Sequence, residues 1–351
     1  RRIVLDTLLL EAAAEAGVEV RTETAVVGLV QEQGVVRGVR TEGGTLVAPL
    51  VVGADGPHSA VARFVGAGEY HVAAPGRLFL WGYFEGAAAA PGRASLGRID
   101  DTGFLAMPTD DGLFLGGVAV SMAKRGAVMA DVEAGFAEGV ARVDELAEIL
   151  RPATRVGPVR VMARWHGYFR EATGPGWVLV GDAGHFKDPT PAQGISDALR
   201  QGEHLASAIE AGLGDADLGH HLEAWWRWRD RDAWEMYWFA HDMGAAGTNP
   251  GMVTEMLRGL SRQRDGAERF LRVLNHELAP SELFSTGRGL RTLATTAATH
   301  PRALPRLVSE TRTLVADEAR RRKLRRQPEF ARAGAATASV SDRDAATHQP
   351  T

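Results

Sequence analysis

The chain has 351 residues, of which 45% are hydrophobic, and its formal net charge is −4. This length and composition predict a soluble globular protein with a substantial core and favour two domains over one. The charge gives no reason to expect a nucleic acid as partner, and no apolar run approaches the roughly 20 residues of a membrane-spanning helix. Because there is no cysteine, disulfides, thiolate catalysis and cysteine-ligated metals are excluded, and we expect a reducing, cytoplasmic compartment.

The first 53 residues predict a helix followed by short strands. Residues 1–17 have leucines and alanines at helical spacing, and Gly17 is a typical C-terminal stop. Short strands are predicted over residues 18–20, 25–30, 34–39, 45–47 and 50–52, the third and fourth of which form a hairpin.

A strand-to-helix turn with an aspartate follows the last of these strands, at Asp55-Gly56. Its ordinary explanation is local: Asp55 and Ser59 cap the turn and the helix, and Arg63 pairs with Asp55. That explanation does not account for a second turn of the same kind later in the chain. The ordered pair of turns favours a cofactor site.

Between about residues 71 and 165 the pattern changes to alternating strands with Gly and Asp turns. This texture predicts an antiparallel sheet inserted between two halves of a cofactor domain, and it is where we expect a substrate pocket. Strands are expected over residues 78–85, 103–108, 113–120 and 160–165, with one helical segment over 131–150.

The segment over residues 177–199 is the most informative in the chain. The apolar run Trp177–Val180 predicts a buried strand, which breaks at Gly181-Asp182 and leads into a loop punctuated by prolines. Gly194 then opens a predicted helix over 195–210. Such a turn places one carboxylate and a row of backbone N–H groups at the carboxyl edge of a parallel sheet, where phosphate-bearing cofactors bind. The alternative is that Asp182 only caps its own turn.

After residue 210 the chain predicts helices and then a disordered tail. The tail covers residues 331–351 and lacks any periodicity. Helices are expected over residues 220–241, 250–263, 266–277 and 301–326.

Several side chains allow two interpretations. His185 either makes a structural hydrogen bond, which we favour, or contacts a bound cofactor or substrate. Lys187 and Asp188 are a surface ion pair by default, with a role beside the cofactor as the alternative. The basic run 320–326 indicates a solvated helix end or a contact with an anionic surface. Core packing or a helix interface is favoured over an aromatic substrate box for a group of tryptophans, Trp225, Trp226, Trp228, Trp234 and Trp238. No zinc-ligand spacing, G-x-S-x-G elbow or Walker-type loop is present, and no metal is expected.

The two aspartate turns resemble fingerprints of a known family. ADGPHSAVAR, over residues 54–63, is similar to the D-G fingerprint of the para-hydroxybenzoate hydroxylase-like flavoprotein monooxygenases, and GDAGHFKDPTPAQGISDA, over 181–198, is similar to their G-D fingerprint. Arg2, Leu5 and Leu9 fit the family's Arg-x-x-Leu-x-x-x-Leu helix. The second fingerprint departs from the usual pattern at Pro191-Ala192, Ser196 and Gln201-Gly202, so a differently shaped pocket is expected.

The resemblance implies an α/β fold: a Rossmann-like FAD-binding domain, incomplete at its N-terminus, with an inserted antiparallel β-sheet substrate domain and a helical C-terminal extension. The family's G-x-G-x-x-G turn is absent, so we expect at least one βαβ unit of about 30 residues before Arg1. The expected division is residues 1–70 and 166–215 for FAD, 71–165 for substrate, 216–330 for the helical region, and 331–351 for the tail.

Carried over residue by residue, the resemblance implies that Asp182 hydrogen-bonds the FAD ribitol and that Gly181 lets the chain pass close to the pyrophosphate. Arg2 would lie near the FAD ribose or phosphate, Val26 would meet the adenine, and Asp55 would brace the FAD loops. The flavin ring would be lined by Pro189, Ala192, Gln193, Gly194 and Ile195, with the helix start stabilising a negative flavin.

The implied activity is that of an FAD-dependent oxidoreductase, a monooxygenase driven by NADPH or NADH. Through a flavin 4a-hydroperoxide it would use dioxygen to hydroxylate or epoxidise a small organic substrate. The alternatives are a flavin-dependent reductase or dehydrogenase without oxygen insertion, and an inactive fragment of the flavoprotein fold. A flavin-dependent halogenase shares the scaffold, but the chain contains no Trp-x-Trp-x-Ile-Pro. No catalytic acid or base, and no oligomeric state, follows from the sequence.

Overall fold

The computed structural model describes residues 1–299, 302 and 304–326. The expected disordered tail over residues 331–351 lies outside this range. The described chain divides into two compact units. The first contains residues 1–25, 74–165 and 244–248, and the second contains 26–73, 166–243 and the chain from 249 onward. The helix at the N-terminus is therefore grouped with the sheet, whereas the sequence pattern assigned it to the FAD-binding segments.

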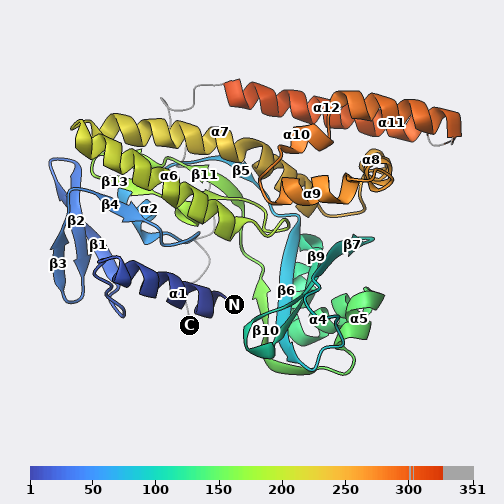
Figure 1. The fold of residues 1–351 in the computed structure, drawn as a ribbon, viewed down its shortest axis with the longest axis horizontal. Helices are drawn as coiled ribbons and strands as arrows, with labels where there is room; N and C mark the ends of the chain where they lie inside the picture. The colour runs from blue at the N-terminus through green and yellow to red at the C-terminus, as the bar shows by residue number, and fades with distance from the viewer. Residues whose placement is uncertain (300–301, 303, 327–351) are drawn as a thin grey trace, which may run out of the picture. The chain divides into compact units, whose positions relative to one another are not determined.

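The first unit is built on a five-stranded antiparallel sheet in the order β10-β6-β9-β8-β7 (Figure 1). Alternation along its strands separates two faces. Leu80 and Val118, which are paired across β6 and β9, point into a core closed by helices α3, α4 and α5. The elements of this unit are α1 (Arg2–Glu15), β6 (Arg77–Glu85), β7 (Ser95–Ile99), β8 (Thr102–Pro108), β9 (Phe114–Ser121), α3 (Arg125–Ala130), α4 (Val132–Ala141), α5 (Asp144–Leu150) and β10 (Thr154–Met162).

The opposite face of this sheet carries aromatic side chains. Phe79, Trp81 and Tyr83 alternate with the buried positions of β6 and are each half-buried. Leu115 of β9 and Leu105 of β8 share that face. Leu115 pairs directly with Tyr83, and Leu105 pairs with Gly117, which is itself the partner of Trp81. The face opposite the helices of this unit is therefore apolar and aromatic.

The second unit contains three small sheets and most of the helices. The sheets have the orders β1-β2-β3, β14-β11-β5 and β12-β13-β4. Their strands are β1 (Val26–Glu32), β2 (Val35–Thr41), β3 (Gly44–Val47), β4 (Val51–Gly53), β5 (Glu69–Ala73), β11 (Gly167–Arg170), β12 (Thr173–Gly174), β13 (Trp177–Leu179) and β14 (His185–Phe186). The helices are α2 (Ala60–Val65), α6 (Gly194–Gly214), α7 (Leu218–Gly244), α8 (Gly251–Ser261), α9 (Gly266–Leu274), α10 (Pro280–Leu283), α11 (Thr286–Thr299) and α12 (Leu304–Arg326).

Helices α6 and α7 pack on the strands that lead into the second aspartate turn. Leu205 of α6 and Trp225 of α7 join a core cluster with Val178 and Val180. The Trp225 indole N–H also donates to the Gln201 carbonyl at 3.2 Å. Trp234 packs in the same unit, 7% exposed. The expected core role is thus confirmed for these two tryptophans.

Four expectations about secondary structure were wrong or incomplete. Residues 18–20 form no strand, because the run is too short and finds no partner strand. The single helix expected over 131–150 is two helices, since Val143 has extended backbone angles. Strand β10 begins six residues before the expected 160, and a register shift interrupts it between Val156 and Arg160. Helices α10 and α11 were not expected.

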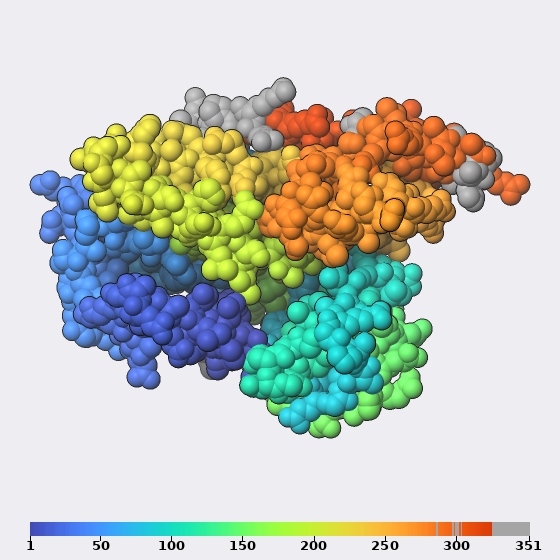
Figure 2. All heavy atoms as spheres, in the orientation of Figure 1, coloured from blue at the N-terminus to red at the C-terminus, as the bar shows by residue number. Residues whose placement is uncertain are grey.

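Helix α1 is rich in leucine and alanine yet has no buried residue, and Figure 2 shows its dark blue atoms at the molecular surface. In the part of the chain that the structure describes, no helix is long and apolar enough to cross a membrane.

Candidate cofactor-binding site

The two aspartate turns leave the same edge of one sheet. Strands β4 and β13 are parallel neighbours, with Val51 opposite Trp177 and Gly53 opposite Leu179. The Val180 amide donates to the Gly53 carbonyl at 2.9 Å, which extends this pairing to the last residue before the second turn. Because the carboxyl ends of parallel strands meet at one edge, the structure brings the two turns together.

A second link between the turns comes from strand β11, and sequence reasoning missed it. The Tyr168 hydroxyl lies 2.7 Å from the Asp182 carbonyl oxygen and 3.1 Å from that of Pro57. Arg170 donates to the Ala183 carbonyl at 3.0 Å and to the Pro57 carbonyl at 3.2 Å. Burial raises the pKa of Tyr168, so its hydroxyl keeps its proton. The only signal in the sequence was a Tyr and an Arg two residues apart, which places both on one face of a strand.

The Asp55 side chain caps the helix that follows it, α2. Its carboxylate accepts hydrogen bonds from the Ser59 hydroxyl at 2.6 Å and from the backbone N–H groups of Ala60 and Val61 at 2.7 and 3.1 Å. This is the capping arrangement considered from the sequence, but among the described residues Asp55 forms no ion pair with Arg63. Asp55 therefore fixes the start of α2 beside the cofactor turns.

Gly181 and Asp182 form the second turn, which follows β13 and precedes the loop that leads to α6. Gly181 has φ +60°, a left-handed angle that glycine adopts without strain, and its N–H donates to the Gln201 side chain at 3.0 Å. A Cβ added at Gly194 would lie 3.8 Å from an Asp182 carboxylate oxygen. The half-buried Asp182 carboxylate consequently lies next to the N-terminus of α6.

The N-cap residue of α6 leaves the first amides of the helix without a capping side chain of its own. Gln193 makes no capping hydrogen bond to the helix, while Gly194 and Ile195 are exposed. A helix of this length places partial positive charge on its first amides. Together with the neighbouring carboxylate, this end offers N–H donors for an anion or a polarised carbonyl and an acceptor for a hydroxyl. These are the groups that FAD requires, so the residues present fit this cofactor.

Buried charged side chains hold the loop over residues 187–193 against α6. Lys187 pairs with Asp197 of α6 at 2.7 Å, and the two side chains are 4% and 12% exposed. The surface ion pair expected between Lys187 and Asp188 is therefore wrong. Asp188 is instead 4% exposed and accepts a hydrogen bond from the Thr190 N–H at 2.9 Å. The local sequence did not show that the loop folds back onto α6.

Asp197 is the centre of this buried group. His276, which directly follows Asn275 at the end of α9, places its Nε2 3.0 Å from the other Asp197 oxygen. Burial by itself raises the pKa of Asp197, but the close contact with His276 and the charge of Lys187 outweigh it and hold that pKa well below its usual range. The carboxylate is therefore ionised at neutral pH.

The buried His185 ring is held by packing against other aromatic rings and not by hydrogen bonds to the described residues. It is 2% exposed, its ring centroid lies 4.5 Å from that of Phe169, and neither ring nitrogen has a hydrogen-bond partner among the described residues. Burial lowers its pKa to about 3, so the ring is neutral. The favoured expectation of a structural hydrogen bond is wrong, since the ring packs in an aromatic cluster.

The remaining predicted contacts involve exposed or half-buried residues. Arg2 lies in α1, in the first unit, where it donates to Asp6 at 2.8 Å and is 68% exposed. Val26 begins β1 in the second unit and is 37% exposed. Pro189 and Ala192 lie in the loop before α6, where Ala192 has φ +57°. Their roles toward FAD stay predictions.

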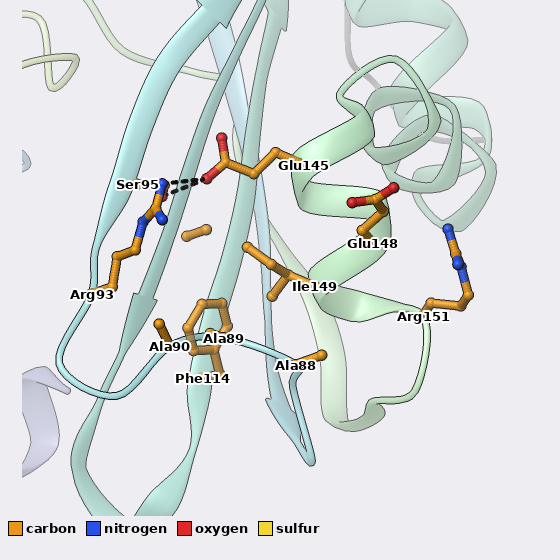
Figure 3. A pocket seen from close by; sticks show the side chains of 11 residues that line it. Ala88, Ala89, Ala90, Arg93, Ser95, Phe114, Glu145, Glu148, Ile149 and Arg151 are labelled. Carbon is orange, nitrogen blue, oxygen red and sulfur yellow. Dashed lines mark hydrogen bonds and ion pairs between the residues drawn. The ribbon is translucent and has the colours of Figure 1, made fainter.

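A cavity of about 490 Å³ lies in the first unit, on the helix-covered side of its sheet (Figure 3). Phe114 and Ala106 line it from the sheet and Ile149 from α5. At one end Glu145 accepts a hydrogen bond from Ser95 at 2.7 Å. Because Phe114 and Ala106 point toward the helices, this cavity does not lie on the aromatic face. Among the described residues, no group of His, Asp or Glu side chains is placed to hold a metal ion.

Comparison with known proteins identifies the family. A family model described as an FAD binding domain matches residues 3–239. The chain belongs to this family. The chain is also 30% identical over 227 residues to the rifampicin monooxygenase of Streptomyces venezuelae, an alignment covering 60% of this chain and 44% of that protein. The chain thus spans less than half the length of this curated relative.

Solved structures share the fold of most of this chain. The flavin-dependent brominase Bmp2 superposes with a TM-score of 0.64 at 19% identity, covering 86% of this chain and 76% of the brominase. The anhydrotetracycline hydroxylase OxyS from Streptomyces rimosus superposes with a TM-score of 0.57 at 19% identity, covering 78% and 55%. The expected α/β fold, the resemblance to the para-hydroxybenzoate hydroxylase-like flavoproteins and FAD as the cofactor are confirmed.

Proposed function

We propose that this protein is an FAD-dependent monooxygenase that uses NADPH or NADH and dioxygen to oxygenate an apolar organic substrate. The observation that carries the proposal is the Asp182 carboxylate beside the uncapped N-terminus of α6. The relation to a rifampicin monooxygenase supports oxygen insertion as the reaction. In this proposal residues 1–70 and 166–215 serve FAD, residues 71–165 serve the substrate, and residues 216–330 form a helical extension.

The protein's own groups have positioning roles in this reaction. Asp182 would accept a hydrogen bond from the flavin's sugar-alcohol chain, and the first amides of α6 would stabilise negative charge on the flavin ring. Pro189, Ala192 and Gln193 would line the ring. When bound, FAD would supply the redox chemistry, namely hydride transfer from the nicotinamide and transfer of one oxygen atom of dioxygen to the substrate, with the second oxygen atom leaving as water.

The aromatic face of the first unit's sheet suits an apolar substrate. Phe79, Trp81 and Tyr83 follow one another along β6 on the face opposite α4 and α5, each half-buried. Flat aromatic side chains provide large contact areas at little entropic cost. We therefore place the substrate on this face of the sheet.

The test is product formation from rifampicin, the compound named in the curated relative, with NADPH under ¹⁸O₂ and under argon. Incorporation of ¹⁸O into the product, together with no product under argon, is the expected result. Product formed equally well without oxygen would instead support the flavin-dependent reductase. NADPH oxidation that yields hydrogen peroxide and no product would reject rifampicin as the substrate but keep the reaction with oxygen.

A further inference from the structure

The helices after residue 249 contact the flavin-lining loop from its buried side. The family match covers residues 3–239, so this region lies outside it. Its helices pack on α7 through a separate core, which joins Met236 to Leu260, Val273 and Leu283. The end of α9 is thereby held at a fixed place in the second unit.

Two contacts join the end of α9 to the loop and to α6. Gln193, the last residue of the loop, donates its side-chain N–H to the Leu274 carbonyl at 2.7 Å. Two residues further along, His276 Nε2 lies 3.0 Å from Asp197 Oδ1. Asp197 in turn pairs through Oδ2 with Lys187 at the start of the loop. One short segment therefore holds both ends of the loop.

Because these groups are buried, the loss of one of their contacts should cost more free energy than at the surface. Lys187 and Gln193 are 5% and 3% exposed, and the side chain of His276 is 6% exposed. A buried carboxylate that loses a partner has no water to replace it, so the loss costs more than it does at a surface. His276 also has φ +61°, a left-handed backbone angle that orients its side chain after the end of α9.

We propose that His276 is a positioning residue for the flavin site: through Asp197 it holds the loop over residues 187–193 and the first turn of α6 in the conformation that receives the flavin ring. His276 acts through another residue and need not touch the cofactor. The proposal rests on the flavin site described above, and it makes the C-terminal helices part of that site's framework.

The test compares two substitutions at one position. Gln places a side-chain nitrogen where histidine has Nε2, whereas Asn reaches only as far as Nδ1. Asn also tolerates the left-handed backbone angle well, so His276→Asn removes the contact to Asp197 without adding backbone strain. His276→Gln keeps the contact. His220→Asn, at an exposed position in α7, is the matched control.

Two readouts are used, neither of which needs substrate, nicotinamide or oxygen. The first is hydrogen exchange of the amides over residues 187–197 in the flavin-free chain, and the second is the dissociation constant of FAD from a fluorescence titration. For His276→Asn we expect about tenfold faster exchange in this segment and about tenfold weaker FAD binding. His276→Gln should stay within about threefold of the wild type, as should His220→Asn.

Unchanged exchange over residues 187–197 in His276→Asn would overturn the proposal. So would faster exchange that is equally large in α9 and α10, because that pattern reports loss of the helical region and not release of the loop. The exchange measurement decides even where a protein binds no flavin. Failure to insert oxygen would count against the proposed monooxygenase activity and would leave this inference untouched.

Discussion

Replacing His185 should change how the stability of this protein depends on pH. The ring is 2% exposed, lacks a hydrogen-bond partner among the described residues, and has a pKa lowered to about 3 by burial. In the unfolded chain a histidine titrates near its ordinary pKa of about 6.5. Below that value the unfolded state takes up a proton that the folded state does not, so stability conferred by neutral His185 is lost as pH falls from about 6.5 toward 3.

The size of this effect follows from the two pKa values. Each pH unit within the interval costs about 1.4 kcal/mol, so the wild type should lose about 2 kcal/mol between pH 7 and pH 5 through this one residue. His185→Leu cannot take up the proton and replaces a ring without hydrogen bonds by an apolar side chain of similar volume. Its unfolding free energy at pH 7 should lie within about 1.5 kcal/mol of the wild type.

Urea unfolding of both proteins at several pH values between 5 and 7.5 provides the measurement. All other titrating groups are common to both chains, so their contributions cancel in the difference between the two unfolding free energies. Phe169→Leu is the control, because it loosens the packing around the same ring (centroids 4.5 Å apart) yet keeps His185. A difference between His185→Leu and wild type that is constant across this pH range would refute the reasoning.

Three further predictions concern the cofactor and substrate sites. Asp182→Asn should weaken FAD binding at least about tenfold in a fluorescence titration, whereas Asp144→Asn, at an exposed position in α5, should not; equal affinities would remove Asp182 from the site. Tyr168→Phe leaves the Asp182 carbonyl without its 2.7 Å partner and should lower the urea midpoint by the equivalent of about 1–3 kcal/mol; an unchanged midpoint would show that the two turns hold together without it. Trp81→Ala should raise the KM for an apolar substrate about tenfold or more with FAD affinity unchanged, and a parallel loss of FAD affinity would contradict the placement of substrate on the sheet.

The local elements and the two turns were predictable from the sequence. The run Trp177–Val180 and the break at Gly181 specify a strand and a sharp turn whatever surrounds them, because periodicity and a left-handed glycine are properties of a few adjacent residues. The same holds for the apolar periodicity that gave α6 and α7. Family fingerprints added FAD, since they too are short contiguous patterns.

The partners of the buried side chains were decided by the tertiary structure alone. Lys187 has a carboxylate beside it in sequence at Asp188, yet it pairs with Asp197 because the loop turns back onto α6 and removes both groups from water. His276, which follows α9 almost 80 residues later in the sequence, contacts the same carboxylate. Nothing in the sequence around either residue records which distant side chain will share its site. Buried charge must find a partner, and only the packing of the whole unit determines which partner is within reach.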